Sequence, residues 1–160
     1  MDLVEQAKRE AISGMELFLR NFSHVPEDKL HWTPVPTAKS ALRVAAHAAL
    51  YAGRFAAMIR ARAVPQPESL ENWLAEQNAE EIAITTREEM EAAFRKGTAE
   101  VLEALDALAP NEVEMSLDSG QGWSMPMTQL MALPGWHATL HLGQIDYLQT
   151  CWGDLEIYLG

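Results

Sequence analysis

The sequence predicts an all-α fold in which four long helices form one bundle and strand content is negligible. Apolar residues recur at a spacing of three and four along four long stretches, and prolines or glycines separate these stretches. The alternation typical of strands is confined to one short segment. With 160 residues, 48% hydrophobic and 22% charged, the chain has the size and composition of one globular domain, so residues 1–160 are expected to fold as a single unit.

The first two helices are predicted on either side of a proline-rich loop. One apolar face marks a helix from Asp2 to about Phe22, with Val4, Ala7, Ala11, Met15 and Phe18 on that face. The loop "HVPEDKLHWTPVPTAKS" contains three prolines and cannot continue the helix. Ser40 can cap a second helix, which must stop before Pro65.

A long crossover precedes the last two long helices. Residues 65–84 are predicted to be a linker with a short helix near 70–78, and its acidic stretch "AEQNAEEIA" is interpreted as a solvated face. Thr86 and Glu89 form a capping box for the third long helix, which Pro110 ends. Residues 111–127 are expected to be irregular or a short hairpin. The fourth helix spans about 128–152, with a kink or a fresh start expected near Leu133 because Pro134 removes a backbone hydrogen bond.

The charge balance argues against some classes of partner. Acidic residues exceed basic ones, 23 to 12, and the formal charge is −11, so a phosphate backbone or an anionic lipid surface is disfavoured. We therefore expect neither nucleic acid nor membrane as a partner. The start of the chain lacks the apolar core of a signal peptide, and the single cysteine, Cys151, allows no intramolecular disulfide. These features fit a cytoplasmic protein, in which Cys151 is expected to be a packing residue.

Three histidines are candidate metal ligands. His137 and His141 stand four apart on the face of the fourth helix that also carries Leu130, Ile145 and Leu148, so both point toward the core. His47 lies in the middle of the second helix among small apolar residues. Buried imidazoles without partners cost about 1–3 kcal/mol, which a shared cation would avoid.

Hydrogen bonds among the three histidines, or to Tyr51 or Gln144, are an equally open alternative at this point. Ala138 stands where a zincin protease has glutamate, which argues against that class. His24 and His31 lie at the end of the first helix and in the proline-rich loop, and a solvated or structural role is expected for them.

The chain resembles the DinB/YfiT superfamily of metal-dependent enzymes. The loop "KLHWTPVPTAKS" matches the family's Leu-x-Trp-x-Pro signature leading to a serine, His47 follows Ser40 by seven residues, and "HATLHLGQI" matches the closing pair of histidines before Gly-Gln-Ile. The resemblance implies an up-down-down-up four-helix bundle, a divalent metal held by His47, His137 and His141, and frequent homodimers. The family usually has a basic residue or a histidine directly before the glycine of this closing motif, and this chain has Leu142 there. Pro134 and Gly135 interrupt a helix that is usually continuous and would reshape the pocket mouth.

The function that the resemblance implies is a metal-dependent enzyme acting on a small-molecule substrate. The metal, zinc or nickel, would activate water or a low-molecular-weight thiol, as in a hydrolase or a thiol S-transferase. Gln144 and Tyr51 are candidates for orienting a ligand or the substrate, and no catalytic residue or general base can be named, because neither histidine helix carries an acidic residue on its inner face. The alternative is a non-catalytic dimeric bundle whose metal or histidine cluster is structural or vestigial and which binds a small ligand.

Overall fold

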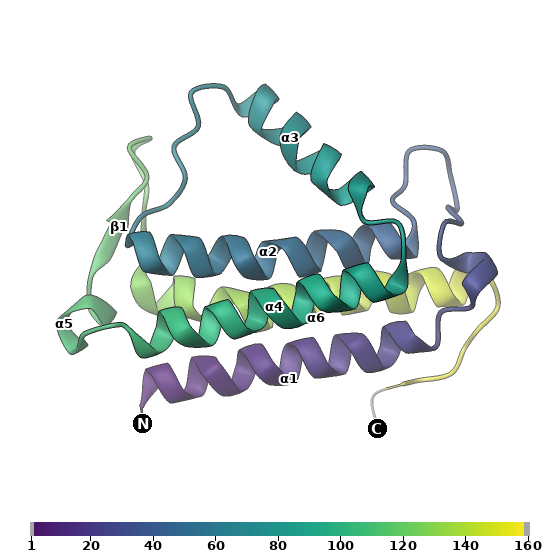
Figure 1. The fold of residues 1–160 in the computed structure, drawn as a ribbon, viewed down its shortest axis with the longest axis horizontal. Helices are drawn as coiled ribbons and strands as arrows, with labels where there is room; N and C mark the ends of the chain where they lie inside the picture. The colour runs from purple at the N-terminus through teal and green to yellow at the C-terminus, as the bar shows by residue number, and fades with distance from the viewer. Residues whose placement is uncertain (1, 159–160) are drawn as a thin grey trace.

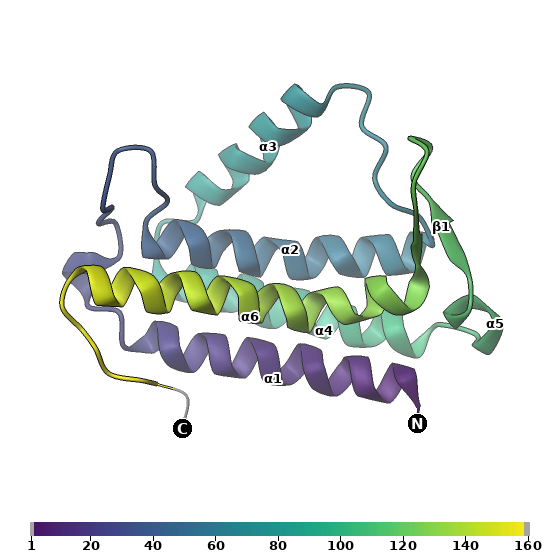
Figure 2. The same cartoon turned by 180° about the vertical axis from the view of Figure 1, so that it is seen from behind.

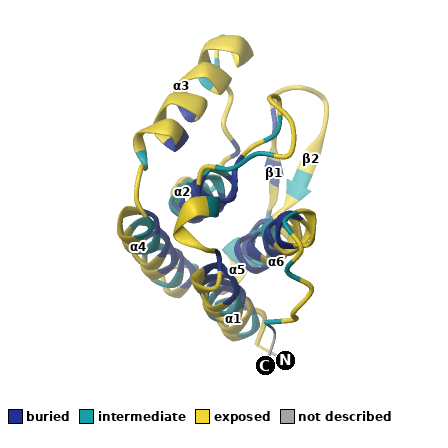
Figure 3. Cartoon of the chain, turned by 90° about the vertical axis from the view of Figure 1, so that its right-hand side faces the viewer, coloured by how far each residue is buried: buried dark blue, intermediate teal, exposed yellow. Residues whose placement is uncertain are grey.

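The computed structural model describes residues 2–158 and confirms the all-α, up-down-down-up bundle. Its four long helices are α1 (Leu3–Ser23), α2 (Ala41–Ala61), α4 (Arg87–Asp106) and α6 (Met127–Cys151). Helices α1 and α6 run in one direction, and α2 and α4 run in the other (Figure 1 and, from behind, Figure 2). Seen from its end, the bundle places α2 between α4 and α6, and α1 on the opposite side (Figure 3).

Side-chain caps mark the starts of α1, α2 and α4, whereas α6 begins after Pro126 without one. The Asp2 side chain accepts hydrogen bonds from the backbone N–H groups of Val4 and Glu5, and the Ser40 hydroxyl accepts one from Arg43. Thr86 and Glu89 form the expected capping box. These caps satisfy N–H groups that have no partner within the helix, and so they fix where α1, α2 and α4 begin.

Small residues allow α2 and α4 to pack closely. The buried face of α2 is rich in alanine, including Ala45, Ala49 and Ala52. Gly97 of α4 lies against it, where an added Cβ would stand 2.7 Å from the backbone nitrogen of Gly53. Larger side chains, such as Phe18 and Phe94 with ring centroids 5.4 Å apart, fill the core between α1 and α4.

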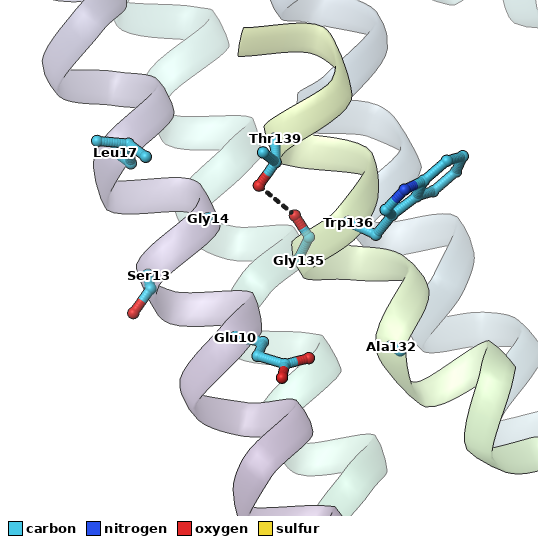
Figure 4. Close-up of a pocket in the computed structure, with 8 residues that line it drawn as sticks. All are labelled: Glu10, Ser13, Gly14, Leu17, Ala132, Gly135, Trp136 and Thr139. Atoms are coloured by element: carbon cyan, nitrogen blue, oxygen red, sulfur yellow. Dashed lines mark hydrogen bonds between the residues drawn. The ribbon is translucent and has the colours of Figure 1, made fainter. Parts of the chain in front are cut away.

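Helix α6 is continuous through Pro134, so the expected fresh start near Leu133 is wrong. Gly135 faces α1, and an added Cβ there would lie 2.7 Å from the carbonyl oxygen of Glu10 (Figure 4). The Thr139 hydroxyl donates to the Gly135 carbonyl at 3.0 Å. Packing against α1 thus holds the helix together despite the lost backbone bond. It also places Gly135 on the α1 side of α6, where it does not shape a pocket beside α2.

The crossover contains a longer helix than expected. Helix α3 (Leu70–Ala83) lies over α2, outside the four-helix square (Figures 1 and 3). Its Gln77 and Glu81 are buried, so the interpretation of this acidic stretch as a wholly solvated face is wrong. Charge and packing from α2, rather than the local sequence, select which of its polar residues turn inward.

The remaining elements are short. They comprise a 3-10 turn at Glu27–Lys29, α5 (Pro110–Val113) and an antiparallel hairpin of β1 (Ser116–Asp118) and β2 (Ser124–Pro126), with Leu117 opposite Met125. The hairpin confirms the expectation for residues 111–127. Among residues 2–158, no helix combines the length and the apolar character that a membrane span requires.

Candidate metal centre

Two neighbouring antiparallel helices bring the three predicted histidines together. His47 lies almost two turns after the Ser40 cap of α2, and His137 and His141 lie one turn apart on α6. One ligand nitrogen from each residue can be chosen so that all three lie within 4.8 Å of one another. The Nε2 atoms of His137 and His141 are 3.0 Å apart, and the ring centroids of His47 and His141 are separated by 4.7 Å. His47, His137 and His141 therefore form one spatial cluster.

Glu81 of α3 was missed by the sequence analysis. Its Oε1 atom lies 2.6 Å from Nδ1 of His47, and the side chain is only 4% exposed. Its other oxygen, Oε2, accepts from Lys39 at 2.6 Å and from Arg43 at 3.3 Å. A carboxylate on Nδ1 fixes the tautomer in which Nε2 carries the lone pair, and this arrangement is common behind metal-binding histidines.

Gln144 holds the outer nitrogen of His141. Its Oε1 atom lies 2.7 Å from Nδ1 of His141, so the imidazole N–H donates and Nε2 is left with its lone pair facing His137. Gln144 was predicted to orient a metal ligand or the substrate, and in the structure it contacts His141, a candidate metal-binding residue. Two of the three imidazoles therefore have an oxygen acceptor on the side away from the cluster.

Tyr51 packs against the cluster through its ring. The ring centroid lies 4.4 Å from that of His47 and 4.9 Å from that of His137, and the Arg54 guanidinium carbon lies 4.8 Å from it. Burial raises the pKa of Tyr51, so its hydroxyl stays protonated at neutral pH. This stacking restricts the rotation of both imidazole rings.

Burial keeps the imidazoles neutral. It lowers the pKa of His137 to about 3, with the neighbouring histidines acting in the same direction. Burial also lowers the pKa of His47 and of His141, although Glu81 and Gln144 respectively oppose the effect. For Glu81, burial acts to raise the pKa, but the hydrogen bonds from Lys39 and His47 outweigh it, and the pKa falls below its ordinary value. At neutral pH the cluster therefore consists of neutral nitrogen donors backed by a carboxylate.

This donor set suits a divalent metal ion. Neutral imidazole nitrogens are typical ligands of zinc, nickel and iron, and three of them leave at least one coordination position for water or substrate. The carboxylate and amide oxygens on the outer nitrogens orient the rings, as they do in known metal sites. The geometry and chemistry of His47, His137 and His141 thus fit the expected ion.

Other candidate residues lie apart from this cluster. His24 is exposed and stacks on Tyr158 with ring centroids 3.8 Å apart, and His31 is exposed in the proline-rich loop. Cys151 is also exposed, so the expectation that it is a packing residue is wrong. It is the last residue of α6 and lies on the exposed side of a turn whose Leu148 and Gln149 are still buried.

Comparison with known proteins identifies the family and the fold. The model of the DinB superfamily matches residues 14–145. A DinB-like protein (YjoA) from Bacillus subtilis superposes with a TM-score of 0.66 at 17% identity, over 96% of this chain and 97% of the other. A mycothiol-dependent maleylpyruvate isomerase gives a TM-score of 0.69 at 14% identity. That superposition covers 89% of this chain but only 60% of the isomerase. A search among curated proteins found no match.

Proposed function

The chain belongs to the DinB superfamily, and we propose that it is a metal-dependent enzyme acting on a small molecule, with His47, His137 and His141 as the metal ligands. The observation that carries this proposal is the convergence of three neutral imidazoles whose outer nitrogens are bonded, in two cases, to side-chain oxygens. A metal ion held there would act as a Lewis acid that activates a water molecule or a thiol as a nucleophile.

The protein's own residues prepare the site for this chemistry. Glu81 and Gln144 hold His47 and His141 in the tautomers that present Nε2, and Tyr51 limits ring rotation. Three protein ligands leave a place for a reacting group, which is the pattern of catalytic rather than structural zinc sites. Glu81 is the only acidic hydrogen-bond partner of the three histidines among residues 2–158, so a nucleophile on the metal would act without a separate general base.

Zinc or nickel is the metal we expect, and a low-molecular-weight thiol is the co-substrate we favour. The shared fold of a mycothiol-dependent isomerase supports the thiol, and hydrolysis is the other reaction type considered. Thiol transfer and hydrolysis differ in whether turnover requires an added thiol, so paired screens with and without one separate them. We also expect a homodimer, which the molecular mass in solution tests.

Metal content tests the proposal directly. Protein prepared without a histidine tag is loaded with zinc or nickel, dialysed and analysed by mass spectrometry, next to the His47→Ala, His137→Ala and His141→Ala variants. The wild type should retain about one ion per chain and each variant far less. His31→Ala is the matched control, since His31 is exposed and outside the cluster, and it should retain the ion. Wild-type protein that holds no metal after loading would overturn the proposal.

An open coordination position separates an enzyme from a purely structural site. Cobalt(II) in place of the native ion gives a visible spectrum that responds to a new ligand. Addition of a small thiol should change the spectrum of the wild type. An unchanged spectrum would indicate a closed site and would favour the non-catalytic bundle instead.

A further inference from the structure

Three helix faces continue from the histidine cluster toward the β1–β2 hairpin. On each helix, residues spaced by four lie on the same face as the residue at the cluster. They are Tyr51 and Phe55 on α2, Leu133 on α6, and Gln77 and Trp73 on α3. Phe55 packs against both His137 and Tyr51, with ring centroids 5.3 Å and 5.7 Å apart respectively. The aromatic side chains of Tyr51 and Phe55 therefore connect the histidine cluster to this adjoining region.

The region contains a cavity of about 310 Å³, which we call the hairpin cavity. Phe55 and Leu133 form its wall toward His137, Trp73 of α3 and Trp123 of the hairpin form further walls, and most of its other lining residues are apolar. Ser119 and Gln121 are the polar residues in the lining, and no lining residue carries a charge. The Ser119 hydroxyl is already engaged with the Trp123 carbonyl at 2.7 Å.

Along α3, Gln77 lies between a residue that lines the cavity and a residue that contacts the metal centre. It lies one turn from Glu81, which contacts His47, and one turn from Trp73, which lines the cavity. The residue is only 7% exposed and its amide lies near the Tyr51 hydroxyl, but its buried Nε2 atom makes no well-formed hydrogen bond among residues 2–158. An unpaired buried amide costs about 1–3 kcal/mol, a cost that a ligand oxygen would remove.

We infer that the hairpin cavity binds the apolar, uncharged body of the substrate, with an oxygen acceptor of that substrate on Gln77 and the reacting group at the histidine cluster. This inference rests on the proposed function for the identity of the ligand as substrate. The cavity volume suits a bicyclic aromatic or a branched aliphatic group. The substrate class is thus a mostly hydrophobic molecule carrying a carbonyl or similar acceptor.

Charge complementarity supports an uncharged body. Arg54 lies on α2 between Tyr51 and Met58 but does not line the cavity. Its Nη2 atom donates to Oε2 of Glu80 at 2.6 Å, and its Nη1 atom has no hydrogen-bond partner among residues 2–158. Lys39 is likewise paired with Glu81 at 2.6 Å. Binding of an anionic body in the cavity would be unfavourable, because the anion would lose its hydration and no lining residue carries a compensating charge.

Fluorescence of prodan, an uncharged dimethylaminonaphthyl ketone, tests the inference on the full-length protein. The probe has an aromatic body for the cavity and a carbonyl acceptor for Gln77, and its emission moves to shorter wavelength in apolar surroundings. Titration is performed on zinc-loaded and on chelator-treated protein in about 0.5 M salt, which reduces the long-range effect of the −11 charge. Saturable binding with one site per chain is expected in both forms. A dimethylaminonaphthalene sulfonate, an anion with the same ring system, should bind at least tenfold more weakly.

Matched variants locate the probe. Trp123→Ala removes an aromatic wall and should weaken binding roughly tenfold. Trp136→Ala removes a similarly exposed tryptophan that lines a different cavity, between α1 and α6 (Figure 4), and should leave binding unchanged. Leu133→Trp fills the cavity from α6 and serves as a second variant should Trp123→Ala fail to fold. Gln77→Leu should weaken binding about 2- to 12-fold and shift the bound emission further to shorter wavelength.

The outcomes separate this inference from the proposed function. No saturable binding, equal binding of the anion, or equal effects of Trp123→Ala and Trp136→Ala would overturn the cavity assignment, whatever the metal content. Unchanged affinity and emission in Gln77→Leu would overturn the role of the amide. Zinc retention is measured in the same variants and should be unchanged, so a protein that binds prodan but no zinc would contradict the proposed function while the cavity assignment stands.

Discussion

Replacement of Glu81 by glutamine should weaken metal binding without unfolding the protein. Glutamine has the same size and can still accept from Nδ1 of His47, so the variant removes the charge while it keeps the shape. Loss of a carboxylate behind a metal-binding histidine costs about 10- to 100-fold in metal affinity, or about 1.4–2.7 kcal/mol. We expect a loss in that range for zinc.

The same substitution should lower stability only moderately. Removal of one partner from a fully buried ion pair costs about 3–5 kcal/mol. Here the side chains of Lys39 and Arg43 are 40% and 30% exposed, and both cations regain water when Glu81 is neutralised. We therefore expect about 1–2 kcal/mol in the free energy of unfolding, measured by urea denaturation of metal-free protein.

Glu80→Gln provides the control for both measurements. Glu80 is the next residue on α3, and its pair with Arg54 at 2.6 Å is on the surface, where the carboxylate side chain is 59% exposed. Zinc affinity is measured by competition with a chromophoric chelator. Glu80→Gln should stay within about twofold of the wild type. Equal affinities in all three proteins, or an equal loss in both variants, would refute the role assigned to Glu81.

Three further predictions concern stability. Gly97→Ala should lower the free energy of unfolding by about 1–3 kcal/mol because its Cβ would meet the Gly53 backbone at 2.7 Å. Gly143→Ala, with no atom within 4 Å of the added Cβ, should be neutral or stabilise by up to about 1 kcal/mol. Thermal melts that rank the two variants in the reverse order would contradict this packing. Ser40→Ala should lower the free energy of unfolding by about 1 kcal/mol through loss of the α2 cap, and a change below about 0.3 kcal/mol in denaturant titrations would show that the cap is unimportant. In metal-free protein the pKa of His137 is lower in the folded than in the unfolded chain, so the unfolded chain binds the proton first. This residue should therefore make stability fall as pH drops from about 6.5 toward 3, by up to about 1.4 kcal/mol per pH unit. The His137→Gln variant should show a shallower slope in urea titrations across that range, and parallel slopes would contradict burial of a neutral imidazole.

The sequence by itself determined the long helices and the orientation of the histidines. Helical periodicity, capping by Ser40 and by Thr86 with Glu89, and chain breaks at prolines act over a few residues, so they can be recognised locally. The spacing of His137 and His141 likewise placed both on one inward face of α6. The hydrogen bond between His141 and Gln144 spans three residues of one helix, so the contact between these side chains can likewise be predicted from local spacing.

Only the tertiary structure decided what surrounds the histidines. Glu81 reaches His47 across 34 residues of sequence, and no local pattern in the polar helix α3 distinguishes it from the exposed Glu80. The hairpin cavity is built from α2, α3, α6 and the β1–β2 region, so its shape exists only after these segments pack. Pro134 is the converse case: its local preference for a break is overridden by the close packing of Gly135 on α1. Local sequence sets which residues can share a helix face, and long-range packing sets which of those faces meet.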